Sequence, residues 1–232
     1  MPKKEYVREM FDSIAPTYDR LNHILSLDVD RLWRRHAIRA IVDGTPQRIL
    51  DVACGTGDST VAAARSAAPG SRVVGVDISE GMMALVRAKA EKEGVADRIS
   101  LLVADGEDLP FGEGSFDRVT CAFGIRNFEH KDLGLKEFHR VLRDGGRAVI
   151  LELSLPERKG LRKLYDLYFL HILPKVGGLL SGKKEAYRYL PASVHGFPPE
   201  GEFRAMMEAA GFRNVTGKAL TFGLCRMFVG EK

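Results

Sequence analysis

Residues 50–58 of the chain read Leu-Asp-Val-Ala-Cys-Gly-Thr-Gly-Asp, a sequence that predicts a strand followed by a tight turn into a helix. Its apolar beginning is typical of a buried strand, and Gly55 and Gly57 permit the tight turn with which a strand passes into a helix. In α/β folds such a turn lies at the carboxyl edge of the sheet, where ligands bind. The pattern Gly-x-Gly also fits a turn that binds nothing, so the surrounding sequence has to discriminate between the two.

Short apolar runs alternate with helical patterns on both sides of this stretch. The predicted strands are Arg48–Ala53, Arg72–Asp77, Ile99–Ala104, Arg118–Phe123 and Arg147–Leu153, and the predicted helices after them include Ser59–Ala68, Glu80–Glu93 and Asp132–Leu142. The strand runs are continuously apolar, which is typical of strands that are covered on both faces in a parallel sheet. The alternation therefore predicts an α/β fold with a doubly wound sheet.

The end of the chain breaks this rhythm. After a predicted helix at Pro199–Ala210, two strand patterns follow at Asn214–Leu220 and Leu224–Val229, joined by a short turn around Thr221–Gly223. A hairpin makes one of these strands antiparallel to the rest. The prediction is thus a seven-stranded, mostly parallel, Rossmann-like sheet that ends in an antiparallel hairpin, an ending more common in methyltransferases than in dinucleotide-binding domains.

Two segments lie outside this core of a single predicted domain, 1–232. Residues 1–42 form a helical cap in which Pro16 should interrupt the first helix, and a second helix from about Asp28 should bury Val29, Leu32, Trp33, Ala37 and Ile41. Residues 156–198 form an apolar insertion, predicted to be a lid over the substrate site. Within it, Leu161–Leu180 should shelter an apolar ligand, with hinges at Gly177, Gly178 and Gly182 and with Lys183 and Lys184 facing lipid.

Composition narrows the class of protein. With 232 residues, 45% of them hydrophobic, the chain has ordinary globular composition and size. Three separated cysteines argue against a disulfide framework and a zinc site and favour a reducing, cytoplasmic compartment. Neither a secretory signal nor a run of about 20 apolar residues is apparent. A net charge of +4 without a long basic block gives no indication of nucleic acid.

The acidic residues at the strand ends favour an adenosine ligand. Asp77 ends the second predicted strand, 22 residues after Gly55, where a carboxylate accepts from both ribose hydroxyls. Asp105-Gly106 ends the third. The third glycine of the dinucleotide motif is missing, and Asp51 and Asp58 would repel a pyrophosphate while suiting an ammonium and a sulfonium. The sequence therefore favours S-adenosyl-L-methionine over a nicotinamide dinucleotide.

The chain resembles the ubiquinone/menaquinone-biosynthesis C-methyltransferases, a family of class I S-adenosylmethionine-dependent methyltransferases, over nearly its whole length. The glycine loop is common to the superfamily, whereas three further segments are specific to this family. They are the leader Met10–Ala15 with Tyr18-Asp19, Leu21-Asn22 and Trp33-Arg34, the turn Phe123-Gly124-Ile125-Arg126-Asn127, and Tyr189-Leu190-Pro191 with Ser193-Val194 and Phe197-Pro198.

The resemblance implies methyl transfer to a ring carbon of a polyprenylated quinol, usually demethylmenaquinol in bacteria. The equivalent step on a 2-polyprenyl-6-methoxy-benzoquinol and the methylation of another small molecule remain alternatives, as do an oxidoreductase and a non-catalytic partner in a quinone-biosynthesis assembly. The implied cofactor contacts are Thr56, Asp77, Asp105 with Gly106, and the backbone near Ala122. Many relatives carry Asn-Ala where this chain has Asp105-Gly106.

Carbon methylation requires an electron-rich ring carbon, so a phenolate must be stabilised. Arg126 follows the fourth predicted strand and is assigned to the phenolate, because its pKa is too high for a base, while Asn127 is assigned to positioning. The alternative is that Arg126 only pairs with Asp105 or Glu152. Tyr18, Asp19 and Asn22 are candidate substrate contacts that could equally be helix-capping or core residues. His130 and His195 are reserve bases.

Contact with a membrane is the last expectation. The insertion is too short and too interrupted to cross a bilayer, but it could enter the interface, and Arg31, Arg34, Arg35 and Arg39 share one face of the second helix. We expect a cytoplasmic protein that contacts the inner face of the cell membrane peripherally. The sequence does not distinguish a monomer from a homodimer.

Overall fold

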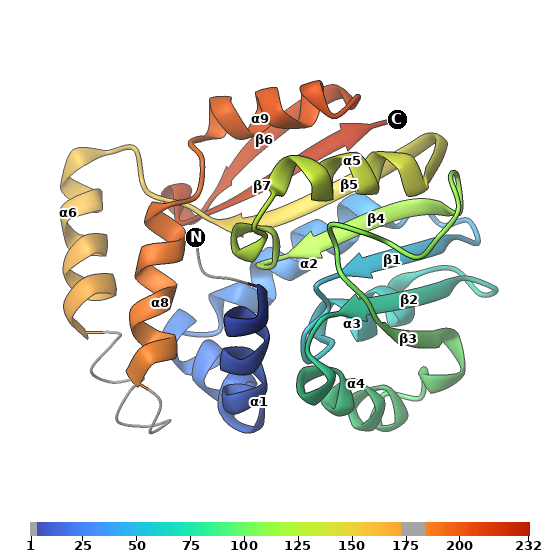
Figure 1. Ribbon diagram of the computed structural model, residues 1–232, viewed down its shortest axis with the longest axis horizontal. Helices are drawn as coiled ribbons and strands as arrows, with labels where there is room; N and C mark the ends of the chain where they lie inside the picture. Colours follow the sequence, from blue (N-terminus) through green and yellow to red (C-terminus); the bar gives the residue numbers. More distant parts are fainter. Residues whose placement is uncertain (1–3, 173–183) are drawn as a thin grey trace.

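One sheet with the strand order β3-β2-β1-β4-β5-β7-β6 forms the centre of the computed structural model, which describes residues 4–172 and 184–232 (Figure 1). Its strands are β1 (Arg48–Val52), β2 (Arg72–Asp77), β3 (Ile99–Val103), β4 (Phe116–Ala122), β5 (Leu142–Leu153), β6 (Arg213–Leu220) and β7 (Cys225–Glu231). Only β7 runs antiparallel to its neighbours, β5 and β6, among these strands. The predicted doubly wound sheet with an antiparallel hairpin is confirmed.

Helices cover both faces of the sheet. They are α1 (Lys4–Ser26), α2 (Val29–Ile41), α3 (Asp58–Ser66), α4 (Glu80–Lys92), α5 (Lys131–Val141), α6 (Lys159–Leu167), α8 (Lys184–His195) and α9 (Glu200–Ala209). Short turns are η1 (Ala96–Arg98), η2 (Ile125–Asn127), the π-helical η3 (Tyr168–Ile172) and η4 (Thr221–Gly223). One core joins α5 and α9 to the sheet, and another joins α2, α3 and α4 to its other face.

Backbone conformation sets where β1 and β4 end. Both strands stop one residue before the predicted end, because Ala53 and Phe123 adopt positive φ angles of 54° and 63° and leave the extended ladder. Strand β5 begins at Leu142 rather than at Arg147, since Leu142 already pairs with Phe116 of β4. The two left-handed residues turn the chain at the carboxyl edge of neighbouring strands.

The cap differs from its prediction in two respects. Helix α1 continues through Pro16 instead of being interrupted there. Proline removes one backbone donor, but contacts on both sides of it, from Ile14 in the core and from Asp19 to the glycine loop, hold the helix together. Leu32 is 48% exposed, because the buried stripe of α2 follows Trp33, Ala37 and Ile41.

The insertion between β5 and α9 contains α6, η3 and α8, which lie beyond the carboxyl edge of the sheet together with α1 (Figure 1). Aromatic and aliphatic side chains of these four elements form a third apolar cluster. The predicted hinges Gly177, Gly178 and Gly182 and residue Lys183 fall outside the described residues. Within the described residues, every helix is too short or too polar to cross a membrane.

Candidate active site

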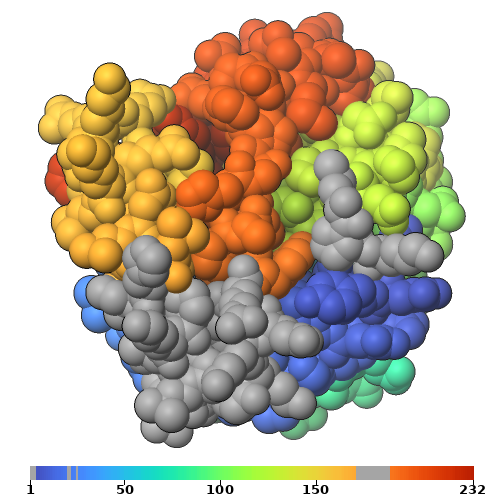
Figure 2. Space-filling model, turned by 60° about the vertical axis from the view of Figure 1, so that its left-hand side comes forward, coloured from blue at the N-terminus to red at the C-terminus, as the bar shows by residue number. Residues whose placement is uncertain are grey.

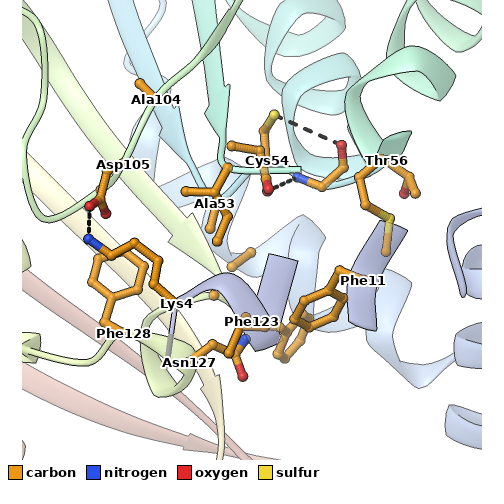
Figure 3. A pocket seen from close by; sticks show the side chains of 18 of the residues that line it. Lys4, Phe11, Ala53, Cys54, Thr56, Ala104, Asp105, Phe123, Asn127 and Phe128 are labelled. Carbon is orange, nitrogen blue, oxygen red and sulfur yellow. Dashed lines mark hydrogen bonds and ion pairs between the residues drawn. The ribbon is translucent and has the colours of Figure 1, made fainter. Parts of the chain in front are cut away.

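A cavity that opens toward solvent lies at the carboxyl edge of the sheet, beneath α1. Its floor comes from the turns after β1, β2, β3 and β4, and its roof from the side chains of Lys4, Val7, Phe11 and Tyr18 (Figure 3). The topology therefore brings the predicted strand-end residues to one site.

The glycine loop after β1 shapes one side of the cavity. Gly55 and Gly57 have φ angles of 55° and 85°, a conformation that favours glycine. A Cβ atom on Gly57 would also lie only 2.5 Å from Val86 of α4. The loop can therefore keep this path only with glycine at residue 57, and it exposes the backbone of residues 55 and 56 to the cavity.

Asp77 ends β2 and lines the cavity beside this loop. Its Oδ2 accepts a hydrogen bond from the Gly55 amide at 2.8 Å, and its Oδ1 accepts one from the Ser79 amide, also at 2.8 Å. Burial raises the pKa of the carboxyl group above its usual value, and the two amides partly oppose this. Each oxygen retains a lone pair, so the carboxylate can accept from two neighbouring hydroxyl groups.

Asp105 and Gly106 form the opposite side, after β3. The Asp105 carboxylate pairs with Lys4 at the start of α1 and accepts a hydrogen bond from the Glu107 amide at 3.0 Å (Figure 3). A Cβ atom on Gly106 would clash with Phe128 and lie 2.8 Å from Val52. The glycine therefore allows Phe128 to pack at the cavity wall, while Asp105 also anchors the roof.

Ala122 and Phe123 line the floor after β4. The guanidinium carbon of Arg34 lies 4.9 Å from the centre of the Phe123 ring, and Trp33 packs against the same ring at 6.1 Å. Arg34 itself lines the cavity and donates to Ser59 at 2.7 Å. Helix α2 thus supports the left-handed residue that closes β4.

Two acids near the glycine loop have different environments. Asp51 is buried, accepts a hydrogen bond from Thr60 at 2.6 Å, and is not among the described residues that line the cavity. Burial raises its pKa to about 7. Asp58 does line the cavity, and although burial opposes ionisation, Arg34 and Lys89 lower its pKa. Asp58 is therefore the charged carboxylate of the pair at neutral pH.

The cap residues Tyr18, Asp19 and Asn22 are placed differently from one another. Tyr18 lines the cavity, with its ring 5.9 Å from that of Phe11. Asp19 accepts a hydrogen bond from Thr56 of the glycine loop and pairs with Lys89 of α4 at 2.6 Å. Asn22 is half-buried and lies outside the described cavity lining. Asp19 thus binds the roof to the loop, and Tyr18 faces the enclosed space.

Arg126 lies behind the cavity wall in a buried ion pair. Its guanidinium donates to Glu152 at 2.8 Å and to the Phe123 carbonyl oxygen, while its backbone amide donates to Glu152 at 3.1 Å. Burial lowers the pKa of Arg126, but Glu152 outweighs this and raises it above the usual value. The alternative pairing with Glu152 is therefore present, and the one with Asp105 is not, since Lys4 pairs with that acid.

Asn127 follows Arg126 and does line the cavity. Its Oδ1 accepts a hydrogen bond from the Tyr189 hydroxyl of α8 at 3.0 Å. The reserve bases His130 and His195 are exposed and lie outside the described lining, and His195 contacts Asp166 at 3.2 Å. The structure thus brings Asn127 and Tyr18 together with Asp77 and Asp105, but it brings neither histidine there.

Lys4, Lys89 and Tyr189 are site residues that the sequence analysis missed. The side chain of each comes from a helix that is far from its partner in the sequence, so no local motif indicates the contact. The sequence does contain an indication that Glu152 has a buried partner, because it is a lone acid in the apolar run of β5. A buried acid in a central strand requires a partner, and Arg126 supplies it.

A group of potential metal ligands lies near the cavity. Single ligand atoms of His23, Asp30 and Asp58 are within 4.8 Å of one another. The Nζ of Lys89 lies 2.5 Å from Asp58, and the Nε of Arg34 lies 3.9 Å from Asp30. These cations already compensate both carboxylates, so the group is an ion-pair network between α1, α2 and α3.

Comparison with known proteins gives concordant matches. The model of the ubiE/COQ5 methyltransferase family matches residues 1–232. Over 230 residues the chain is 48% identical to the ubiquinone/menaquinone biosynthesis C-methyltransferase UbiE of Geobacter sulfurreducens, covering 99% of this chain and 90% of that protein. It is 45% identical to the demethylmenaquinone methyltransferase of Bacteroides fragilis, covering 99% and 94%.

A solved structure shares the fold. The crystal structure of a SAM-dependent methyltransferase from Aquifex aeolicus superimposes with a TM-score of 0.61 and 17% identity, over 85% of this chain and 88% of that one. At this identity the likeness concerns the fold alone. It agrees with the strand order and the antiparallel final strand described above.

Proposed function

The chain belongs to the ubiE/COQ5 methyltransferase family, and from this premise we propose that it methylates a ring carbon of a polyprenylated quinol. The methyl donor is S-adenosyl-L-methionine, and the acceptor is demethylmenaquinol. The relatives named for menaquinone methylation and those named for both quinones are similar to this chain over nearly all of its length. The equivalent benzoquinol of ubiquinone biosynthesis is therefore the second candidate substrate.

One observation carries the proposal. Candidate contacts for the donor and candidate contacts for the acceptor line a single cavity: Asp77 and Asp105 on its floor, and Tyr18 and Asn127 nearer α8. Methyl transfer requires both reactants in one enclosed space with the reacting atoms in line. A cavity that held only the donor would not need the contacts at Tyr18 and Asn127.

The donor side fits an adenosine with a charged tail. The lone pairs of Asp77 match the two ribose hydroxyls, and Asp105 can accept from an exocyclic amine. Asp58 adds a carboxylate near the loop, which suits the positive charges of the amino-acid end. When bound, S-adenosyl-L-methionine supplies an electrophilic methyl group on a sulfonium.

The acceptor side would stabilise a quinol that loses a hydroxyl proton. The guanidinium of Arg126, which is paired with Glu152, places a permanent positive charge behind the wall formed by Phe123 and Asn127. That charge favours a phenolate over a neutral ring hydroxyl. Asn127, fixed by Tyr189, would orient the ring through its amide group. The rings of Phe11 and Tyr18 exclude water from the same space.

The direct test is turnover by the purified chain. We expect formation of S-adenosylhomocysteine and of the C-methylated product from a short-tailed demethylmenaquinol, with Asp77→Ala as a control whose turnover at low donor concentration is reduced. Absence of product with both this quinol and the benzoquinol, from a protein that binds the donor, would refute the proposal. The quinone pool of cells lacking the protein then distinguishes the substrates, since the accumulated precursor is the physiological acceptor.

Three further expectations accompany this function. We propose a cytoplasmic protein that contacts the inner face of the cell membrane, because a polyprenyl tail resides in the bilayer. Residues 156–198 would act as a lid over the quinol, and residues 1–42 as its cap. The homodimer considered from the sequence stays a prediction, which sedimentation equilibrium of the purified protein tests.

A further inference from the structure

Helix α6 exposes apolar side chains on the outside of the molecule. Leu164 is 63% exposed and Leu167 54%, one helical turn apart, and Leu170 in η3 is 47% exposed. Leu133 on α5, in contrast, has no other exposed large hydrophobic residue near it in the described sequence. Three exposed leucines within seven residues form a local apolar patch, which marks a surface that meets an apolar partner.

Basic side chains border this patch. Arg158, Lys159, Arg162 and Lys163 are all exposed, and Asp166 is the single acid between residues 158 and 170. Asp166 already contacts His195 and Arg162. Among the described residues, no carboxylate lies within ion-pair distance of Lys159 or Lys163. The border therefore presents positive charge that complements an anionic surface.

Spacing places the lysines beside the leucines. Lys163 precedes Leu167 by four residues, and Lys159 precedes Lys163 by four, so all three lie along one side of the helix. Leu164 lies next to this row, away from the buried Tyr165. A row of lysines along an apolar stripe is the arrangement of helices that lie flat in a membrane interface, with the leucines down and the ammonium groups at the headgroups.

The opposite side of the same helix leads inward. Tyr165 and Phe169 are buried, stacked at 4.2 Å, and belong to the apolar cluster that includes Phe11, Tyr18 and Met82. The last three residues line the cavity. The apolar cluster thus connects the buried side of α6 and η3 with side chains that line the cavity, and Figure 2 shows α6 at the outer surface beside α8.

We propose that α6 is the membrane-docking element of this protein, which lies flat on an anionic bilayer through Leu164 and Leu167 and holds its headgroups with Lys159 and Lys163. This inference deepens the proposed function, because it names the surface through which the site meets a membrane-resident acceptor. Docking by this face brings α6 and η3 to the bilayer, with the apolar cluster around Phe169 directly behind them. A prenyl tail would then pass from lipid to the cavity without crossing water.

Vesicle binding of the full chain tests the proposal. The probes are vesicles of phosphatidylcholine alone and of phosphatidylcholine mixed with phosphatidylglycerol, and binding is measured by co-sedimentation. We expect tighter binding to the anionic vesicles. Leu164→Gln/Leu167→Gln should weaken it at least tenfold, because two exposed leucines no longer enter the interface. Lys159→Gln/Lys163→Gln should weaken it about 30-fold, from about fivefold per lysine.

Matched variants control for composition. Leu102→Gln/Leu133→Gln changes two leucines of 41% and 42% exposure elsewhere, and Lys92→Gln/Lys218→Gln removes the same charge from other helices and strands. Both should bind as the wild type does. Equal losses in the controls or wild-type binding by both α6 variants would each overturn the proposal. Because the assay contains no quinol, it is independent of whether methyl transfer occurs.

Discussion

Exchanging Glu152 for glutamine removes the negative charge that faces Arg126 in the interior. Glu152 is completely buried, and the Arg126 side chain is 5% exposed, so water does not replace the missing partner. Breaking a buried ion pair from one side costs about 3–5 kcal/mol. The Arg126 amide donates to Oε2 and the Leu153 amide to Oε1, so the single oxygen of glutamine can accept from only one of them. Because that one hydrogen bond is retained, we take the low end of the range, about 3 kcal/mol.

The expected result is a lower melting temperature. In a domain of this size, about 3 kcal/mol corresponds to roughly 6–12 °C. The double variant Arg126→Met/Glu152→Gln removes both charges and should melt closer to the wild type than Glu152→Gln does, because no uncompensated charge remains. Differential scanning calorimetry of these three proteins and of Arg126→Met alone gives the coupling between the two residues.

Turnover of the same proteins separates structure from catalysis. If the charge of Arg126 stabilises a phenolate, the double variant should be folded yet lose about 10²-fold in kcat, the scale for one electrostatic contact to the transition state. Wild-type turnover by a folded double variant would show that Arg126 only holds the turn. An unchanged melting temperature of Glu152→Gln would refute the buried ion pair itself.

Four further outcomes test other parts of the site. Asp77→Ala should weaken S-adenosylmethionine binding at least tenfold in calorimetry, since it removes two charge-assisted hydrogen bonds; an unchanged affinity would contradict the ribose assignment. Arg126→Lys should lose about 10²-fold in turnover with the donor affinity retained, because the shorter lysine side chain does not carry its ammonium to the position of Nη1, which donates to both Glu152 and the Phe123 carbonyl. Asp51→Asn should flatten the pH dependence of the melting temperature between about pH 4 and 7. Because the pKa of Asp51 is raised to about 7, the folded protein holds a proton in this range that the unfolded chain has released. The wild type therefore loses stability as the pH rises from about 4 to 7, and the variant should not. Gly106→Ala should cost about 1–3 kcal/mol by overpacking against Phe128 and Val52, measured by urea unfolding; a wild-type midpoint would contradict the close packing there.

Local patterns were sufficient to predict the sheet and the floor of the site. Continuous apolar runs identified the parallel strands. The order of these strands places Gly55, Asp77 and Asp105 at one edge of the sheet, independently of the conformation of the loops. Strand ends were less accurate, because the left-handed backbone of Ala53 and Phe123 is imposed by the tertiary structure. Alanine and phenylalanine rarely adopt positive φ angles, so the sequence gives no indication of this conformation.

The roof and the rear wall depended on contacts that a sequence does not display. Lys4 meets Asp105 from 101 residues away, and Tyr189 meets Asn127 from 62. Arg126 is a residue for which the sequence left two roles open. Its place after β4 predicted a role at the reacting carbon, with a pairing to Asp105 or Glu152 as the alternative, and the structure contains the ion pair with Glu152.

The two sides of the cap are held by different forces. Toward the donor, α1 is fixed by polar contacts: Lys4 to Asp105, Asp12 to Ser79 at 2.5 Å, and Asp19 to Thr56. Toward α8 and η3, α1 packs through the apolar cluster that includes Met10 and Ile14.

Directional hydrogen bonds and ion pairs fix one geometry, whereas apolar side chains can repack around an apolar guest with little loss. A bulky hydrophobic acceptor therefore enters at lowest cost between α1 and the insertion, while the donor side keeps its shape. This asymmetry matches the chemistry, since the sulfonium must be held in a fixed line and the prenyl tail need only be sheltered.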